Sequence, residues 1–120
     1  MKLALLVPMR AQPIRRELFL YTLQRTRGVT PIQLIVRVDD DDTDTRDWLR
    51  ANMDATVLIG PRYDGYRSLP RYFNEMVKQV DSDTTAIMCG NDDMRFETMD
   101  WAGLMCRATR RYQTGIFNLG

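Results

Sequence analysis

The sequence predicts an α/β fold: a mostly parallel sheet of four to five strands with helices on both faces. Short apolar runs at residues 3–7, 33–38, 56–59 and 84–89 alternate with segments of helical periodicity. The runs lack the apolar–polar alternation of a strand with one solvent face, so both faces of the sheet are expected to be covered. Strands that alternate with helices pair in parallel through right-handed crossovers.

The first two helices have start and stop signals. Pro13 stands at a favoured first helical position, and Gly28 is typical of the residue just past a helix end. Asp44 is expected to cap a second, short helix that reaches Met53, with Asp47 in its first turn.

The second half of the chain continues the alternation. Apolar residues recur at helical spacing between Leu69 and Val80, which predicts a strongly amphipathic third helix. After the fourth apolar run, Thr98 is expected to cap a last helix. Ile116 and Phe117 are expected to begin a further strand.

Composition restricts the chemistry that the chain can perform. Its 120 residues suit a single domain over 1–120, and a net charge of +1 gives no reason to expect a nucleic acid or anionic membrane partner. The absence of histidine excludes Ser-His and Cys-His catalysis and His-ligated zinc. No apolar run approaches the ~20 residues of a transmembrane helix. Cys89 and Cys106 form no CxxC pair and are expected to be buried thiols in a protein of the reducing cytosol.

Acidic residues follow the second and fourth strands. The stretch VDDDDTDT at residues 38–45 holds five aspartates, and GNDDMRF at 90–96 holds two more. Parallel strands end at one edge of their sheet, where ligands bind, so both clusters are expected at that edge. A helix cap needs only one carboxylate, and four adjacent ones repel each other. The loop after the first strand has no glycine-rich phosphate-binding motif.

The loop after the fourth strand is a candidate metal or substrate site. Asn91, Asp92 and Asp93 offer the oxygen ligands that hard divalent cations prefer, although two aspartates in a turn also have a structural explanation. Arg67 and Arg71 lie near the same edge, on the polar face of the third helix. Their guanidinium groups suit a phosphate or a base edge, and a solvated helix face explains them equally well.

These motifs resemble those of one enzyme family. VDDDDTD at 38–44 resembles the VDDGSTD signature of family 2 glycosyltransferases, whose GT-A fold has a Rossmann-like nucleotide-binding half. VPMR at 7–10 is similar to the Val-Pro turn that ends their first strand, and GNDDMRF resembles their DxD metal motif. The spacing of Gly65, Leu69 and Asn74 resembles their glycine-to-asparagine helix start. The match spans nearly all of the chain, with Asn91 at the position of the motif's first aspartate.

The resemblance implies a nucleotide-diphospho-sugar donor and a Mn²⁺ or Mg²⁺ ion. The residues that it assigns to the nucleoside are Pro8, Met9 and Arg10 around the base, Asp39 or Asp40 on the base, and Asp41 nearby. Asp93, with Asn91 or Asp92, would hold the metal against the diphosphate. The metal would stabilise the charge of the leaving nucleoside diphosphate.

The resemblance also implies that the acceptor-binding half lies beyond this chain. An apolar surface is then expected where that half would pack, and the chain is expected to associate with itself. No catalytic base is identified; Glu97 and Asp100 are candidates only by proximity. Two alternatives stay open: a non-catalytic module that binds a nucleotide or nucleotide sugar, and a parallel α/β interaction domain.

Overall fold

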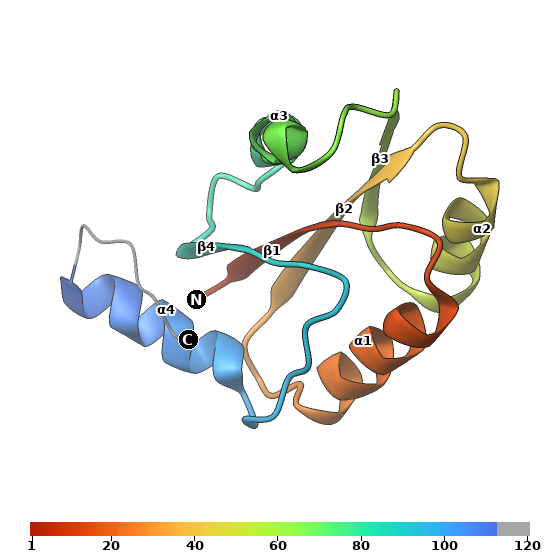
Figure 1. Ribbon diagram of the computed structural model, residues 1–120. Coiled ribbons are helices and arrows are strands. Elements are labelled where there is room, and N and C mark those ends of the chain that lie inside the picture. The colour runs from red at the N-terminus through yellow and green to blue at the C-terminus, as the bar shows by residue number, and fades with distance from the viewer. Residues whose placement is uncertain (113–120) are drawn as a thin grey trace.

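The computed structural model describes residues 1–112, the side chain of Tyr66 apart, and confirms the α/β class (Figure 1). Its four strands are β1 (Leu3–Pro8), β2 (Ile32–Asp39), β3 (Thr56–Gly60) and β4 (Ala86–Cys89). Its helices are α1 (Pro13–Arg25), α2 (Thr43–Asn52), α3 (Leu69–Val77) and α4 (Trp101–Tyr112), with a 3₁₀ turn η1 (Tyr66–Ser68) before α3. The strand expected at Ile116 and Phe117 lies outside the described residues.

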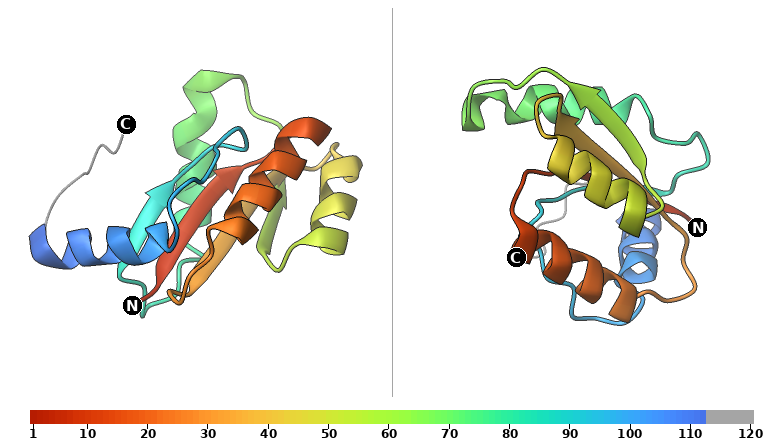
Figure 2. Two further views of the ribbon diagram at one scale, coloured as in Figure 1. Left: turned by 90° about the horizontal axis from the view of Figure 1, so that it is seen from below. Right: turned by 90° about the vertical axis from the view of Figure 1, so that its right-hand side faces the viewer.

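Helices cover both faces of the sheet, as predicted. α3 lies on one face, and α1, α2 and α4 lie on the other (Figures 1 and 2). Successive side chains of a strand point to opposite faces, so Leu5 of β1 belongs to the core under α1, α2 and α4, whereas Leu6 belongs to the smaller core under α3. Burial on both sides explains why β1 is a continuous apolar run.

The strands run parallel in the order β3-β2-β1-β4. β1 lies in the interior of the sheet, where Leu3 is in register with Ile32 of β2 on one side and with Ala86 of β4 on the other. The chain therefore adds strands in one direction from β1 to β3 and then crosses back over β1 to place β4. Open α/β sheets bind ligands at the carboxyl edge where the strand order reverses, which here lies between β1 and β4.

The cap of α2 corrects one prediction. Asp42, and not Asp44, caps the helix: its carboxylate accepts hydrogen bonds from the Thr45 amide at 3.1 Å and from the Thr45 hydroxyl at 2.7 Å. Asp44 lies in the first turn and pairs with the buried Arg16 at 3.0 Å. The helix begins before Asp44 because the Asp42 carboxylate is in reach of the amide three residues on.

Asp42→Ala is expected to lower the free energy of unfolding by about 1 kcal/mol, because the Thr45 amide loses its side-chain acceptor. Asp40→Ala is the matched control, since the neighbouring Asp40 is exposed and caps no helix. Urea unfolding of both variants measures the difference. Equal losses would contradict the assignment of the cap.

The start of α4 corrects a second prediction. The Thr98 side chain does not cap the helix, and the residue directly before it is Asp100, with a positive φ of 52°. Its amide donates to the Thr26 carbonyl at 2.8 Å, and its carboxylate accepts from the Thr30 amide at 3.3 Å. Thr30 precedes β2, so Asp100 lies at the amino edge of the sheet. It is therefore remote from a site at the carboxyl edge.

The cysteines differ in exposure. Cys106 lies on the buried side of α4, as expected for a buried thiol, whereas Cys89 is exposed. Cys89 belongs to an edge strand, on the face where Ile87 is also exposed. Within residues 1–112, no helix is both long and apolar enough to cross a membrane.

Candidate functional site

A cavity of about 320 Å³ opens at the carboxyl edge of the sheet, between the ends of β1 and β4. Seven residues predicted from the sequence line it: Pro8, Met9, Arg10, Asp39, Asn91, Asp92 and Asp93. They come from three separate loops or strand ends that only the parallel sheet brings together. The expectation that both acidic clusters lie at one edge of the sheet is confirmed.

Four other predicted residues do not line the cavity. Asp40 is exposed, and its amide donates to the Gly60 carbonyl at 2.7 Å. Asp41 is exposed and pairs with a neighbouring arginine. Arg71 stacks its guanidinium on the Tyr63 ring at 3.8 Å, and Arg67 lies exposed on η1.

Six lining residues were not predicted: Gln12, Arg15, Arg37, Gly65, Leu69 and Tyr72. Gln12 and Arg15 begin the helix that follows β1, so the rule that ligands bind at the carboxyl edge would have included them. Arg37 interrupts an apolar strand, and a buried arginine in such a place needs polar partners. Tyr72 was counted only as part of the apolar stripe of the third helix.

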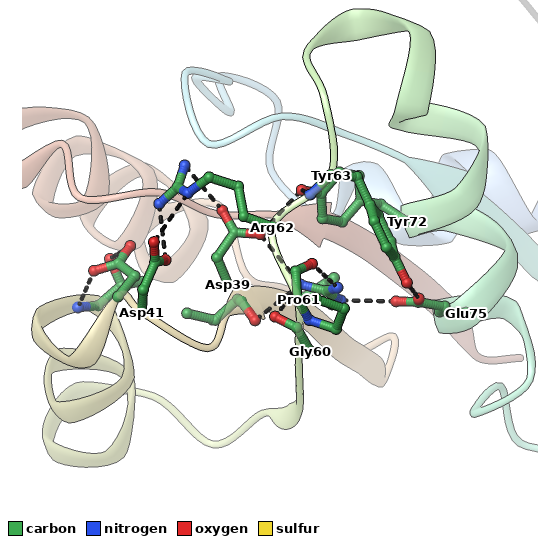
Figure 3. A network of polar contacts seen from close by, with 12 residues as sticks. Asp39, Asp41, Gly60, Pro61, Arg62, Tyr63, Tyr72 and Glu75 are labelled. Atoms are coloured by element: carbon green, nitrogen blue, oxygen red, sulfur yellow. Dashed lines mark hydrogen bonds and ion pairs between the residues drawn. The ribbon is translucent and has the colours of Figure 1, made fainter.

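Asp39 is buried and held from three sides. One carboxylate oxygen accepts from the Tyr72 hydroxyl at 3.0 Å and from Arg37 at 3.3 Å, and the other pairs with Arg62 at 3.2 Å (Figure 3). A carboxylate offers about four lone-pair sites, so little acceptor capacity remains for a nucleobase. Asp39 shapes the cavity wall and carries a negative charge that its neighbours largely balance.

Arg62 joins two aspartates of the acidic run. Its guanidinium lies between Asp39 and Asp41 and donates two hydrogen bonds to Asp41, at 3.0 and 3.2 Å (Figure 3). The hydrogen bond from Arg62 holds the pKa of Asp41 below its ordinary value. Asp42 caps α2 and Asp44 pairs with Arg16, so in residues 1–112 only Asp40 presents a carboxylate of this run without a partner.

Arg37 is the centre of the polar network under the cavity. Its guanidinium donates to Glu75 at 2.7 Å and to the carbonyl oxygens of Gly60 at 3.2 Å and Pro61 at 2.7 Å. The side chain is 1% exposed and lies over the rings of Tyr63 and Tyr72, at 5.2 and 4.7 Å. Burial is the largest single influence and lowers the pKa of Arg37, but Glu75, Tyr63 and Tyr72 together outweigh it, so the pKa lies above its ordinary value.

This network fixes the loop after β3. Tyr63 donates its amide hydrogen to the Tyr72 hydroxyl at 2.9 Å, and its own hydroxyl donates to Glu75 (Figure 3). Gly60 has no room for a side chain, because a Cβ there would lie 2.7 Å from the Arg37 guanidinium. The loop therefore reaches α3 along a fixed path and places Gly65 and Leu69 in the cavity wall.

The loop after β4 forms the acidic end of the cavity. Asp92 is buried, and its carboxylate accepts from the Arg10 amide at 3.3 Å, which ties the loops after β1 and β4 together. Asn91 and Asp93 are exposed at the same cavity. The two adjacent carboxylates therefore have different surroundings.

The loop after β4 does not form a metal site by itself, but it suits a site that substrate phosphates complete. Among the residues that the structure describes, no three Asp, Glu, Cys or His side chains gather to hold an ion by themselves. Magnesium, however, is commonly held by one or two carboxylates together with substrate phosphates. Asp93, with Asn91 or Asp92, supplies such a partial set.

Basic side chains line the same cavity. Arg10 and Arg15 belong to its lining, and α1 begins there without an acidic residue in its first turn and without a hydrogen bond from the Gln12 side chain to its amides. Free amides and the helix dipole add to the positive potential at the start of α1. Acidic and basic groups at one cavity suit a ligand that bears phosphate and is accompanied by a cation. Comparison of the sequence with protein-family models and with curated proteins found no match in either case.

Proposed function

We propose that this chain binds the nucleotide-diphospho-sugar donor of a glycosyltransferase and takes part in transferring the sugar to an acceptor. The observation that carries the proposal is the cavity between β1 and β4. Seven residues to which the resemblance to family 2 glycosyltransferases gives a role in donor or metal binding surround this one space.

Different lining residues suit the phosphates, the base and the metal of a nucleotide-sugar complex. Arg10 and Arg15 offer charge-assisted hydrogen bonds to phosphate oxygens, which are stronger than neutral ones. Pro8 offers apolar surface for a base, whereas Met9 is buried in the core and supports the cavity wall from behind. A divalent cation held by Asp93 and Asn91 would neutralise charge on the diphosphate leaving group.

A second candidate is a binding module without catalysis. It is favoured by the state of the carboxylates that line the cavity: Asp39 is held by three partners, Asp92 accepts from the Arg10 amide, and Asp93 is the proposed metal ligand. None of these three is free to act as a base, and Asp100 lies at the other edge of the sheet. In this reading none of the three carboxylates that line the cavity serves as a base.

The test is calorimetric titration with UDP-, GDP-, CDP- and dTDP-sugars, each with and without Mn²⁺. We expect one nucleotide to bind, and to bind more tightly with the metal present. Thermal unfolding gives a second readout, because a ligand at 100 times its dissociation constant stabilises the folded state by about 2.7 kcal/mol. Failure of all four nucleotides to bind would overturn the proposal. Binding without any sugar transfer would favour the non-catalytic module.

Arg15→Ala distinguishes a contact inside the cavity from a general effect of charge. We expect it to weaken nucleotide binding, because Arg15 lines the cavity and α1 keeps its own hydrogen bonds without it. Arg50→Ala is the matched control, since Arg50 is exposed in the last turn of α2 and does not line the cavity. Equal affinities for both variants would show that the nucleotide lies elsewhere.

A further inference from the structure

A second cavity of about 380 Å³ lies along β4, on the face of the sheet that carries α4. Its floor and walls are mainly apolar, with Met88, Phe96, Trp101, Leu104 and Met105. It shares no lining residue with the cavity between β1 and β4. We refer to it as the β4 groove.

Trp101 gives the β4 groove an unsatisfied polar group. The side chain is 8% exposed and stacks on Phe96 with ring centres 4.7 Å apart. Its indole nitrogen is buried, and no acceptor for it exists among residues 1–112. Buried donors nearly always have a partner, so the surroundings of Trp101 are incomplete within residues 1–112.

The strand beside the groove is an open edge. Within the described sheet β4 pairs only with β1, and its sequence, AIMC, has neither a charge nor a proline to discourage pairing. Met88 shares the groove face with Leu5, with which it is in register. Ile87 lies on the other face and is 50% exposed.

The rim of the groove carries one basic and one acidic side chain. Arg95 and Glu97 are both exposed, and neither forms an ion pair within residues 1–112. They are two residues apart in the chain and carry opposite signs. A two-fold interface presents the same patch on both partners, so two copies of this chain would offer each other both charges.

We propose that a second copy of this chain pairs its β4 strand antiparallel to β4 about a two-fold axis, forming a continuous eight-stranded sheet. An axis perpendicular to the sheet keeps each face on its own side, so the two α4 helices meet and the two grooves become one. Leu104, 50% exposed on α4, is then covered by the second copy. The dimer is independent of the nucleotide-sugar proposal.

The experiment is the oligomeric state of the chain, measured by sedimentation velocity over a wide concentration range. A reducing buffer prevents disulfide cross-linking through the exposed Cys89. We expect wild type to dimerise and Ile87→Lys to stay monomeric, because a lysine on β4 places like charges together at the axis. Ile59→Lys is the matched control: Ile59 is 48% exposed in β3, the edge strand at the other side of the sheet. This variant is expected to dimerise as wild type does.

Two further measurements keep the proposal testable if Ile87→Lys does not fold. Leu104→Glu alters only an exposed side chain of α4 and is also expected to give a monomer. In a Trp48→Phe background, Trp101 is the only tryptophan, and its emission is expected to shift to the blue as dimer forms. A monomer at all concentrations, or equal dissociation of the Ile59→Lys and Ile87→Lys variants, would overturn the proposal. If the chain is a monomer and the Trp101 emission stays constant, the groove does not bind a second copy, and its occupant is another part of the same chain or a different partner.

Discussion

Replacing Arg37 with methionine is expected to lower the free energy of unfolding by about 3–5 kcal/mol. The guanidinium is buried and pairs with Glu75 at 2.7 Å and Asp39 at 3.3 Å. Its removal leaves the buried Asp39 short of a cation and deprives the carbonyl oxygens of Gly60 and Pro61 of a donor. Methionine resembles the aliphatic part of arginine and lacks the guanidinium, so the loss reports the contribution of that group. Urea unfolding at pH 7 measures it.

Arg62→Met is the control for that substitution. Arg62 contacts the same Asp39, at 3.2 Å, but its side chain is 48% exposed. Exposed ion pairs contribute about 1 kcal/mol or less, so the loss is expected to be several times smaller. Equal losses for Arg62→Met and Arg37→Met would show that burial of Arg37 is not what makes it important.

The Arg37–Glu75 pair also determines how the stability of the protein changes at acidic pH. Burial raises the pKa of Glu75, but hydrogen bonds from Tyr63 and Arg37 outweigh burial and hold it below its ordinary value of 4.5. Its contribution to stability is therefore present above pH 4.5 and is lost as the pH falls through the lower, folded-state pKa. In Arg37→Met part of that contribution is already gone. Stability should therefore fall less between pH 5 and pH 3 than it does in wild type.

Asp93→Asn is expected to remove the metal dependence of donor binding, with a loss of affinity of at least about tenfold, or roughly 1.4 kcal/mol. The substitution keeps the shape of the side chain and removes its charge. Asp93 is exposed at the acidic end of the cavity, so folding does not depend on it. The apo protein is expected to gain slightly in stability, because repulsion among the nearby carboxylates falls. Calorimetric titration with and without Mn²⁺ measures the binding.

Asp92→Asn is the matched control at the neighbouring position. Asp92 is buried and its carboxylate accepts from the Arg10 amide at 3.3 Å, so its substitution is expected to alter stability more than metal dependence. Unchanged, metal-dependent binding by Asp93→Asn would place the metal elsewhere. A larger loss of metal dependence in Asp92→Asn would exchange the roles of the two residues.

The sequence predicted the fold well because the apolar runs are unambiguous. Residues 3–7 are apolar without interruption, and the structure places them in the middle of a sheet that is covered on both faces. The gathering of the acidic loops followed from the parallel arrangement alone. The position of β4 beside β1 was beyond sequence reasoning, because it depends on a crossover whose direction no local pattern specifies.

The orientation of individual side chains was harder to predict, and the acidic run shows why. Asp39 is the last residue of β2 and faces the cavity, whereas Asp41 points to Arg62 and Asp42 turns back to cap α2. Those directions follow from where the strand ends and the helix begins, within one or two residues. Arg37 was visible as a break in an apolar strand, but its partner Glu75 lies 38 positions away in the chain.

The position of β1 in the sheet determines which of its edges is open while the chain is being synthesised. Ala86 of β4, the partner of Leu3, is synthesised roughly 4–16 s after Leu3 at ordinary elongation rates. Until then β1 pairs with β2 alone, and the most apolar strand of the chain is the edge of a three-stranded sheet. Open apolar edges pair readily with other chains. Nascent chains that pause before Ala86 are therefore the form of this protein most exposed to aggregation and most in need of a chaperone.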